Sequence, residues 1–216
     1  MTESAKRTTA YHEAGHAIAM LYLEGEKDPL HKVTIIPRGR ALGVTMSLPG
    51  EDKFTYSKEY LENQLAMLFG GRIAEVQHLN GQQTSGASND IERATDLARR
   101  MVTQWGMSSL GPMNYGEKDS QVFLGRDIGS KSHISETMAA KVDAEVRQFI
   151  DKAYARCDTL LKKYRKELDT VAKALLEHET LDAEQVKALI AGKAPASKSI
   201  KLATKAGKAK LVAVEA

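Results

Sequence analysis

Apolar residues recur at three- and four-residue spacing along most of the 216-residue chain, a pattern that is typical of amphipathic helices. The first such stretch covers residues 5–24 and stops at Gly25, a residue that commonly ends helices. Ser57 is the expected N-cap of a second helix that runs to about His78. The later expected helices cover residues 89–105, 134–164, 166–177 and 182–191, the last with Thr180 as its cap.

Two β-prone runs interrupt the helical pattern, residues 31–36 and 42–48. A Pro-Arg-Gly-Arg connection joins them, so we expect an antiparallel β-ribbon. Residues 107–133 are rich in glycine and predict a long loop. The fold class that follows is mainly α, an array of about six helices with one small β-ribbon, in a single domain over residues 1–192.

Charge divides the chain into two unequal parts. The whole chain has 31 basic and 28 acidic residues, a net charge of +3. Residues 193–216 hold six lysines and one acid, so residues 1–192 carry a net charge of −2. We expect residues 193–216 to form a flexible, lysine-rich tail, and we expect no nucleic-acid partner because the tail has neither arginine nor aromatic residues for base stacking. A binder of nucleic acid or of a membrane surface that acts through this tail is an alternative function class.

Several features predict a soluble chain in a reducing compartment. The longest apolar run, residues 17–23, is far shorter than the roughly 20 residues that span a bilayer. The first residues lack the basic-then-apolar layout of a secretory signal. The single cysteine, Cys157, cannot form an internal disulfide.

An HExxH pattern, His12-Glu13-Ala14-Gly15-His16, lies within the first expected helix. Histidines four residues apart project from one helical face, close enough to bind one zinc ion together. The glutamate beside the first histidine can then take a proton from an activated water. Glycine costs about 1 kcal/mol in a helix interior, so we expect another segment to pack closely against Gly15. A surface helix with spare histidines is the alternative.

A catalytic zinc site needs a third protein ligand besides the two histidines. The other histidines are poorly placed, because His31 begins a strand, His78 and His178 end helices, and His133 lies in the long loop. A distant carboxylate is therefore expected, and Asp90, at the start of a helix, is the best-placed candidate. The alternative is an ordinary first-turn acid favoured by the helix dipole.

Five segments carry a resemblance to a known family: TAYHEAGHAIA (9–19), IIPRGRALGVTMSLP (35–49), GGRIAE (70–75), TSGASNDIERAT (84–95) and MVTQWGMSSLGPMNY (101–115). In this order and spacing they closely resemble the proteolytic domain of FtsH, the membrane-anchored, ATP-dependent zinc metalloprotease of bacteria and organelles. The resemblance extends over about residues 5–190.

The resemblance implies a zinc endopeptidase with one zinc ion per chain. Its ligands would be His12, His16 and Asp90, and its general base would be Glu13. The family's Gly-Arg-x-Ala-Glu-Glu segment keeps its first glutamate here as Glu75, whereas the second is valine. Glu75 is thus a candidate to orient a ligand histidine through the free ring nitrogen. A salt bridge elsewhere on the helix is the alternative.

The β-prone run that contains Gly43, Val44, Thr45 and Met46 is a candidate substrate-binding edge strand. An edge strand can bind an extended peptide by strand addition, largely regardless of its side chains. This mode suits a protease that acts on diverse unfolded chains, and it resembles how the family is thought to present substrate. A purely structural ribbon is the alternative.

The resemblance also implies a larger parent protein on the cytoplasmic side of the inner membrane. Such a protein joins this domain to a membrane segment and to an AAA+ ATPase, which uses ATP to deliver unfolded or damaged membrane and cytosolic proteins, and it assembles as a homohexameric ring. The present sequence contains no phosphate-loop motif and no membrane-spanning segment, so ATP is expected only in the parent. The last three expected helices carry apolar stripes that we expect to hold more side chains than one small core can bury, and contacts between copies in a ring would cover the excess. These side chains include Leu160, Leu161, Val171, Leu175 and Leu176. An assembly module with a secondary metal site is the second function class.

Overall fold

The structure is a computed structural model, and it describes residues 2–37, 39, 42–48, 54–116 and 134–193. Its α-helices are α1 (Glu3–Tyr22), α2 (Lys58–Leu68), α3 (Gly70–His78), α4 (Ser88–Thr103), α5 (Glu136–Lys163), α6 (Arg165–His178) and α7 (Ala183–Ile190). The other elements are β1 (Leu30–Thr34), β2 (Val44–Ser47), β3 (Thr180–Asp182) and the 3-10 helix η1 (Ser85–Ala87). The expected mainly α class with a small sheet is confirmed.

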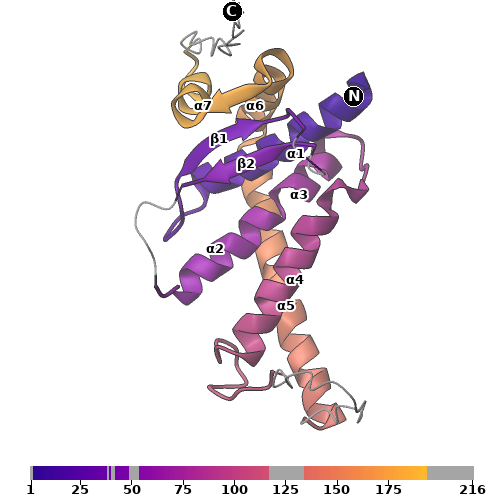
Figure 1. Ribbon diagram of the computed structural model, residues 1–216, viewed down its shortest axis with the longest axis vertical. Helices are drawn as coiled ribbons and strands as arrows, with labels where there is room; N and C mark the ends of the chain where they lie inside the picture. The colour runs from indigo at the N-terminus through magenta and orange to yellow at the C-terminus, as the bar shows by residue number, and fades with distance from the viewer. Residues whose placement is uncertain (1, 38, 40–41, 49–53, 117–133, 194–216) are drawn as a thin grey trace, which may run out of the picture.

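The helix that carries the HExxH pattern, α1, lies behind the β1–β2 ribbon, in the half of the molecule that holds the sheet (Figure 1). α1 packs against α3 and α6 and also touches both strands of the ribbon. α4 and α5 lie side by side along the long axis of the molecule, and α6 and α7 close the end that holds the sheet. Side chains on α1 can therefore meet groups from several distant segments of the sequence.

α1 begins and ends with clear local signals. The Thr2 side chain caps it by accepting a hydrogen bond from the Ala5 N–H, at 3.2 Å. The helix ends at Tyr22, two residues earlier than expected, and Gly25 follows with a φ of 90° that favours glycine. The predicted first helix is therefore confirmed, with a small shift of its bounds.

The single helix expected over residues 57–78 is wrong, because the chain forms α2 and α3 with a turn at Phe69. The Phe69 N–H bonds the Ala66 carbonyl at 3.3 Å, a tighter pattern than an α-helical turn. The turn brings α3 against α1, where a Cβ on Gly15 would overlap the Gly70 carbonyl oxygen. A Cβ on Gly70 would lie 2.7 Å from the Gly15 oxygen. The close neighbour predicted for Gly15 is thus confirmed, and it is α3.

The predicted β-ribbon is confirmed, but the sheet has a third strand. β1 and β2 pair antiparallel, with Val33 opposite Thr45, and β3 pairs antiparallel with the other side of β1. The strand order β2-β1-β3 leaves β2 at an edge. Thr180, expected to cap the last helix, belongs to β3, and Asp182 caps α7 in a capping box with Gln185. Three residues are too short a run to show the alternation of a strand.

Most apolar side chains of the helices α5 and α6 are buried in the core of the chain. Leu161, Val171 and Leu175 are fully buried, and Leu160 and Leu176 pack partly buried against the same core. The apolar excess expected on these helices is therefore not present, because the core of the single chain takes it up.

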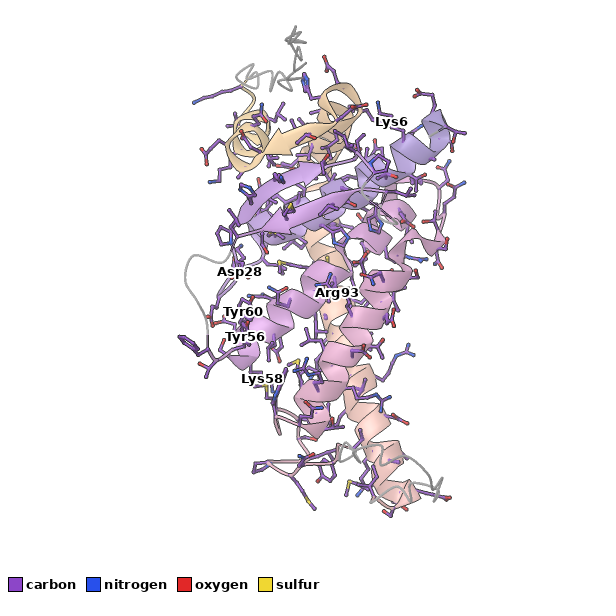
Figure 2. All side chains as sticks on the ribbon, viewed as in Figure 1. Lys6, Asp28, Tyr56, Lys58, Tyr60 and Arg93 are labelled. Carbon is purple, nitrogen blue, oxygen red and sulfur yellow. The ribbon has the colours of Figure 1, made fainter. Side chains whose placement is uncertain are left out.

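α2 is anchored to the segment that precedes β1. The Tyr60 hydroxyl donates to Asp28 Oδ2 at 2.7 Å in a buried contact, and both residues are labelled in Figure 2. Burial, followed by the hydrogen bond to Asp28, raises the pKa of Tyr60. The Asn63 amide donates to the carbonyl oxygens of Glu24 and Glu26, at 3.0 and 2.8 Å. These contacts fix α2 relative to the end of α1.

Within the part of the chain that the structure describes, no helix has the length and apolar character needed to cross a membrane. Two expectations lie largely outside the described residues. They concern residues 117–133 of the expected long loop and residues 194–216 of the expected tail.

Candidate metal centre

The histidines of the HExxH pattern face one another on α1, as their spacing predicts. His12 Nε2 and His16 Nε2 are 3.1 Å apart, and their rings meet edge to face with centroids 4.8 Å apart. About 12% of the His12 side chain and 13% of the His16 side chain is exposed, so most of the pair is buried. One helical turn thus directs two nitrogen atoms at one point.

Asp90 reaches the same point from the first turn of α4. Its Oδ2 atom lies 3.2 Å from His12 Nε2 and 3.3 Å from His16 Nε2. The short helix η1 leads into α4, and the Thr84 side chain caps η1 by accepting from the Gly86 N–H at 3.1 Å. The structure therefore brings together three groups that are separated by up to 78 residues in sequence.

The hydrogen bonds at the Nδ1 atoms determine which ring nitrogen of each histidine carries the proton. His16 Nδ1 lies 2.8 Å from the Met67 carbonyl oxygen, which can only accept, so this nitrogen carries the proton. His12 Nδ1 lies 2.8 Å from Glu75 Oε1 and likewise donates to an acceptor. In their neutral forms both histidines then direct an Nε2 lone pair at Asp90 Oδ2.

These three donor atoms fit a zinc ion. One ligand atom each from His12, His16 and Asp90 lies within 4.8 Å of the other two. Two imidazole nitrogens and one carboxylate oxygen form a ligand set typical of catalytic zinc, which keeps a further position for water or substrate.

Negative charge surrounds His12 from two sides. Burial lowers the pKa of His12, but hydrogen bonds with Asp90 and Glu75 outweigh it and raise the pKa to about 9. Burial raises the pKa of Asp90, while hydrogen bonds with His12 and His16 bring it well below its usual value. The two carboxylates favour a positive charge at this point, which suits a metal ion bound by deprotonated ligands.

Glu75 is itself held in place by three hydrogen bonds. Only 1% of its side chain is exposed, and besides His12 it accepts from the Thr84 N–H at 3.0 Å and the Thr84 hydroxyl at 3.1 Å. Burial raises the pKa of Glu75, but the hydrogen bonds from His12 and Thr84 bring it below its usual value. A charged Glu75 therefore fixes the His12 ring.

Glu13 lies on the side of α1 that faces the ribbon. It is buried, with 6% of the residue exposed, and its Oε2 accepts a hydrogen bond from the Thr45 hydroxyl at 2.7 Å. A Cβ on Gly43 would lie 2.7 Å from Glu13 Oε1. The carboxylate next to His12 therefore lies against the candidate substrate strand.

The open edge of β2 follows from strand alternation. The Leu48 N–H bonds the Pro29 carbonyl at 3.2 Å, so the backbone of Leu48 faces β1. Because successive residues of a strand point to opposite sides, Val44 and Met46 also face β1, whereas Thr45 and Ser47 face away from it. Thr45 and Ser47 thus present backbone groups at the edge of the sheet.

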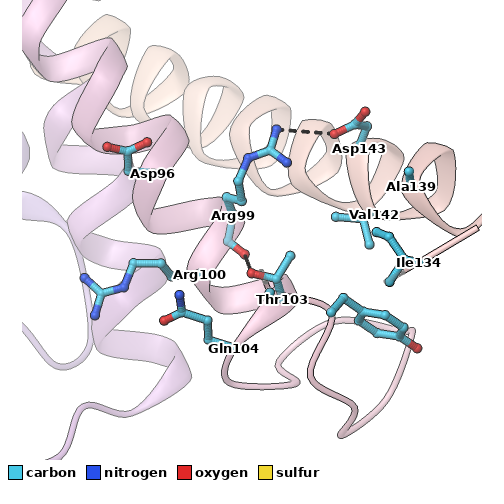
Figure 3. Close-up of a pocket in the computed structure, with 11 residues that line it drawn as sticks. Asp96, Arg99, Arg100, Thr103, Gln104, Ile134, Ala139, Val142 and Asp143 are labelled. Atoms are coloured by element: carbon cyan, nitrogen blue, oxygen red, sulfur yellow. Dashed lines mark hydrogen bonds and ion pairs between the residues drawn. The ribbon is translucent and has the colours of Figure 1, made fainter. Parts of the chain in front are cut away.

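Two hollows lie along α4 beyond its first turn, away from the candidate ligands. One, of about 660 Å³, lies between α4 and α5 and contains the ion pair of Arg99 and Asp143, whose atoms are 3.3 Å apart (Figure 3). The other, of about 390 Å³, lies between α2 and α4 and is lined by Tyr56 and Arg93, both labelled in Figure 2. Asp90 lies at the opposite end of α4 and lines neither hollow.

Some groups around the site could not be predicted from the sequence. The Met67 carbonyl carries no signal because any residue supplies one, and the contact of Thr84 with Glu75 depends on the path of a loop. Gly71 did carry a signal, since paired glycines in a helix indicate a close approach. A Cβ on Gly71 would lie 2.6 Å from His12 Nδ1.

Comparison with known sequences identifies the family. The model of peptidase family M41 matches residues 1–189. The ATP-dependent zinc metalloprotease FtsH of Acidobacterium capsulatum is 55% identical over 193 residues, which are 89% of this chain and 30% of the relative. The protein of the same name from Magnetococcus marinus is 53% identical over 202 residues, 93% of this chain and 30% of the relative.

A third relative is the ATP-dependent zinc metalloprotease FtsH 4 of Sorangium cellulosum, which is 52% identical over 195 residues. These residues are 89% of this chain and 30% of that relative, so the chain spans less than a third of the length of the curated relatives it matches. The chain belongs to peptidase family M41, and it is a protease domain of that family.

Proposed function

We propose that this domain is a zinc endopeptidase that binds one zinc ion per chain through His12, His16 and Asp90. The observation that carries the proposal is the convergence of one oxygen and two nitrogen atoms within 4.8 Å of one another. The zinc metalloprotease names of the relatives support the choice of metal. When bound, zinc supplies a Lewis acid that polarises a peptide carbonyl and lowers the pKa of a water molecule toward about 7.

In this proposal Glu13 moves the proton. Its carboxylate takes a proton from the attacking water and later passes it to the leaving amine. Glu75 keeps the His12 ring in one orientation through the 2.8 Å hydrogen bond to Nδ1, and the Met67 carbonyl does the same for His16. Fixed ligands limit the reorganisation that the site needs during the reaction.

We further propose that the segment of Gly43, Val44, Thr45 and Met46 binds the substrate as an added strand. Within it the backbone of Thr45 faces the open edge, whereas Val44 and Met46 pair with β1 and hold the segment in place. The edge position of β2 and its proximity to Glu13 support this. Leu42 and Leu48, at either end of β2, are 52% and 50% exposed and would contact apolar side chains of an unfolded chain. Backbone pairing accepts many sequences, as expected for degradation of diverse proteins.

The wider context is also a proposal, supported by the resemblance to FtsH and by relatives named ATP-dependent. In it the domain is part of a longer protein on the cytoplasmic side of the inner membrane. An AAA+ ATPase module delivers unfolded or damaged membrane and cytosolic proteins, and six copies form a ring. The protease domain covers residues 1–192, and residues 193–216 are an extension without a role in hydrolysis.

The metal assignment is tested by loss of ligands. Asp90→Asn should lower the zinc content well below one ion per chain and abolish hydrolysis of a short fluorogenic peptide, because two histidines alone bind zinc weakly. Asp96→Asn, on the same helix, is a matched control that should keep both the zinc content and the hydrolysis of the peptide. Atomic absorption on the purified proteins gives the zinc content. Full zinc occupancy in Asp90→Asn would contradict the assignment.

A further inference from the structure

One hydroxyl on the edge strand contacts the carboxylate of the proposed general base. Thr45 Oγ1 lies 2.7 Å from Glu13 Oε2 and 3.1 Å from the Glu13 carbonyl oxygen. The hydroxyl has a single proton, and a hydrogen bond to a carboxylate is shorter and stronger than one to a neutral carbonyl. The contact therefore fastens β2 to α1 at Glu13 itself.

Gly43 lies close to the same Glu13 side chain and restricts the space around it. A Cβ on Gly43 would lie 2.7 Å from both Cγ and Oε1 of Glu13, and the φ angle of Gly43 is not in the left-handed region. A glycine is thus needed here because a larger side chain would clash with Glu13, and not because the backbone conformation requires it. Thr45 of β2 therefore holds Glu13 by a hydrogen bond at Oε2, and Gly43, directly before β2, lies close to Cγ and Oε1.

Thr45 also takes part in the proposed peptide-binding edge. Its backbone N–H and C=O face away from β1, whereas its side chain points to α1. One residue thus presents groups to an added strand and holds the base. A peptide paired with β2 would be placed in a fixed relation to Glu13.

Resting on the proposed function, we infer that Thr45 is a positioning residue that keeps the Glu13 carboxylate in the orientation that accepts the proton. A general base acts only within hydrogen-bond reach of the proton it takes. A glutamate side chain has three rotatable bonds, and loss of the Thr45 hydroxyl frees it to adopt other rotamers. Oε2 is held by Thr45, which leaves Oε1 to take the proton.

The test compares variants of the zinc-loaded 216-residue chain on a short fluorogenic peptide. Thr45→Val removes the hydroxyl but keeps the shape and the backbone edge, so kcat should fall about 10- to 100-fold while KM changes little. Thr45→Ala should behave in the same way, and Thr45→Ser should restore most of kcat. Thr34→Val is the matched control, because the Thr34 hydroxyl bonds the Glu179 carbonyl and Thr180, away from Glu13. Its kcat should stay unchanged.

Three further readouts separate positioning of Glu13 from general damage to the fold. Zinc content should remain at one ion per chain in Thr45→Val, and its crystal structure should show Glu13 in a different rotamer. In a Glu13→Gln background, the added Thr45→Val change should leave the small residual rate, measured at high enzyme concentration, without further loss, because the two residues act through one group.

Unchanged kcat in Thr45→Val, or an equal further loss in the Glu13→Gln background, would overturn the inference. If Glu13→Gln is inactive while Thr45→Val has full activity, only the role of Thr45 fails. Full activity of Glu13→Gln would instead overturn the proposed function, and the inference with it.

Discussion

Glu75 illustrates how one buried charge is stabilised by the groups around it. Burying a carboxylate is costly unless hydrogen bonds replace its water. Glu75 accepts from the His12 ring and twice from Thr84, at 2.8 to 3.1 Å, so its oxygens are well satisfied. The same bonds that offset burial also fix the orientation of a proposed zinc ligand.

Replacing Glu75 should weaken zinc binding without removing a ligand. In Glu75→Gln the side chain keeps its size but loses its charge, so we expect zinc affinity to fall roughly 10- to 100-fold. Competition with a chromophoric chelator measures the change. Glu62→Gln, whose side chain is 42% exposed on α2, is the control and should bind zinc normally. Equal affinities of the two variants would show that Glu75 does not support the metal site.

At the scale of elements, local signals predicted α1, α5 and the ribbon, because caps and periodic apolar residues define them. They did not predict the turn at Phe69 or the strand β3. The turn depends on α3 meeting α1 through Gly15 and Gly70, a contact between distant segments. The pairing of His12 and His16 is local, so their spacing alone predicted it. The contact of Asp90 with them joins distant segments, so its role as a ligand was expected only from the family resemblance.

The open edge of β2 leads to a prediction for substrate binding. Ser47→Pro removes an N–H that faces away from β1, so an added peptide strand loses a hydrogen bond and KM should rise several-fold. Zinc content should be unchanged, since Ser47 contacts no proposed ligand among the described residues. Ser47→Ala keeps the N–H and serves as the control. A normal KM in Ser47→Pro would place the substrate elsewhere.

For the whole molecule, the proposed zinc ion joins α1 to α4. Apart from the ion, the two helices are linked through α3, which packs on α1 and is hydrogen-bonded to Thr84 in the loop before η1. The apolar side chains of α5 and α6 are already used in the core of one chain. Contacts between copies would therefore depend on other surfaces of this domain and on the further parts of the proposed longer protein.

We accordingly expect assembly of this domain by itself to be weak and dependent on concentration. Light scattering over a concentration series should show the mass rise from 23.7 kDa toward about six times that value, as a cyclic hexamer requires. A constant 23.7 kDa at high concentration would contradict ring formation by this domain. A ring of the proposed longer protein would then have to be held together by its ATPase module or membrane segment.

The most direct test of the central claim, zinc-dependent peptide hydrolysis with Glu13 as base, is a Glu13→Gln variant measured beside the unchanged chain. The change removes the base and leaves His12, His16 and Asp90 in place. We predict one zinc ion per chain in both proteins, and loss of casein hydrolysis in the variant alone. A zinc-loaded Glu13→Gln variant that still hydrolyses casein at the original rate would contradict the account.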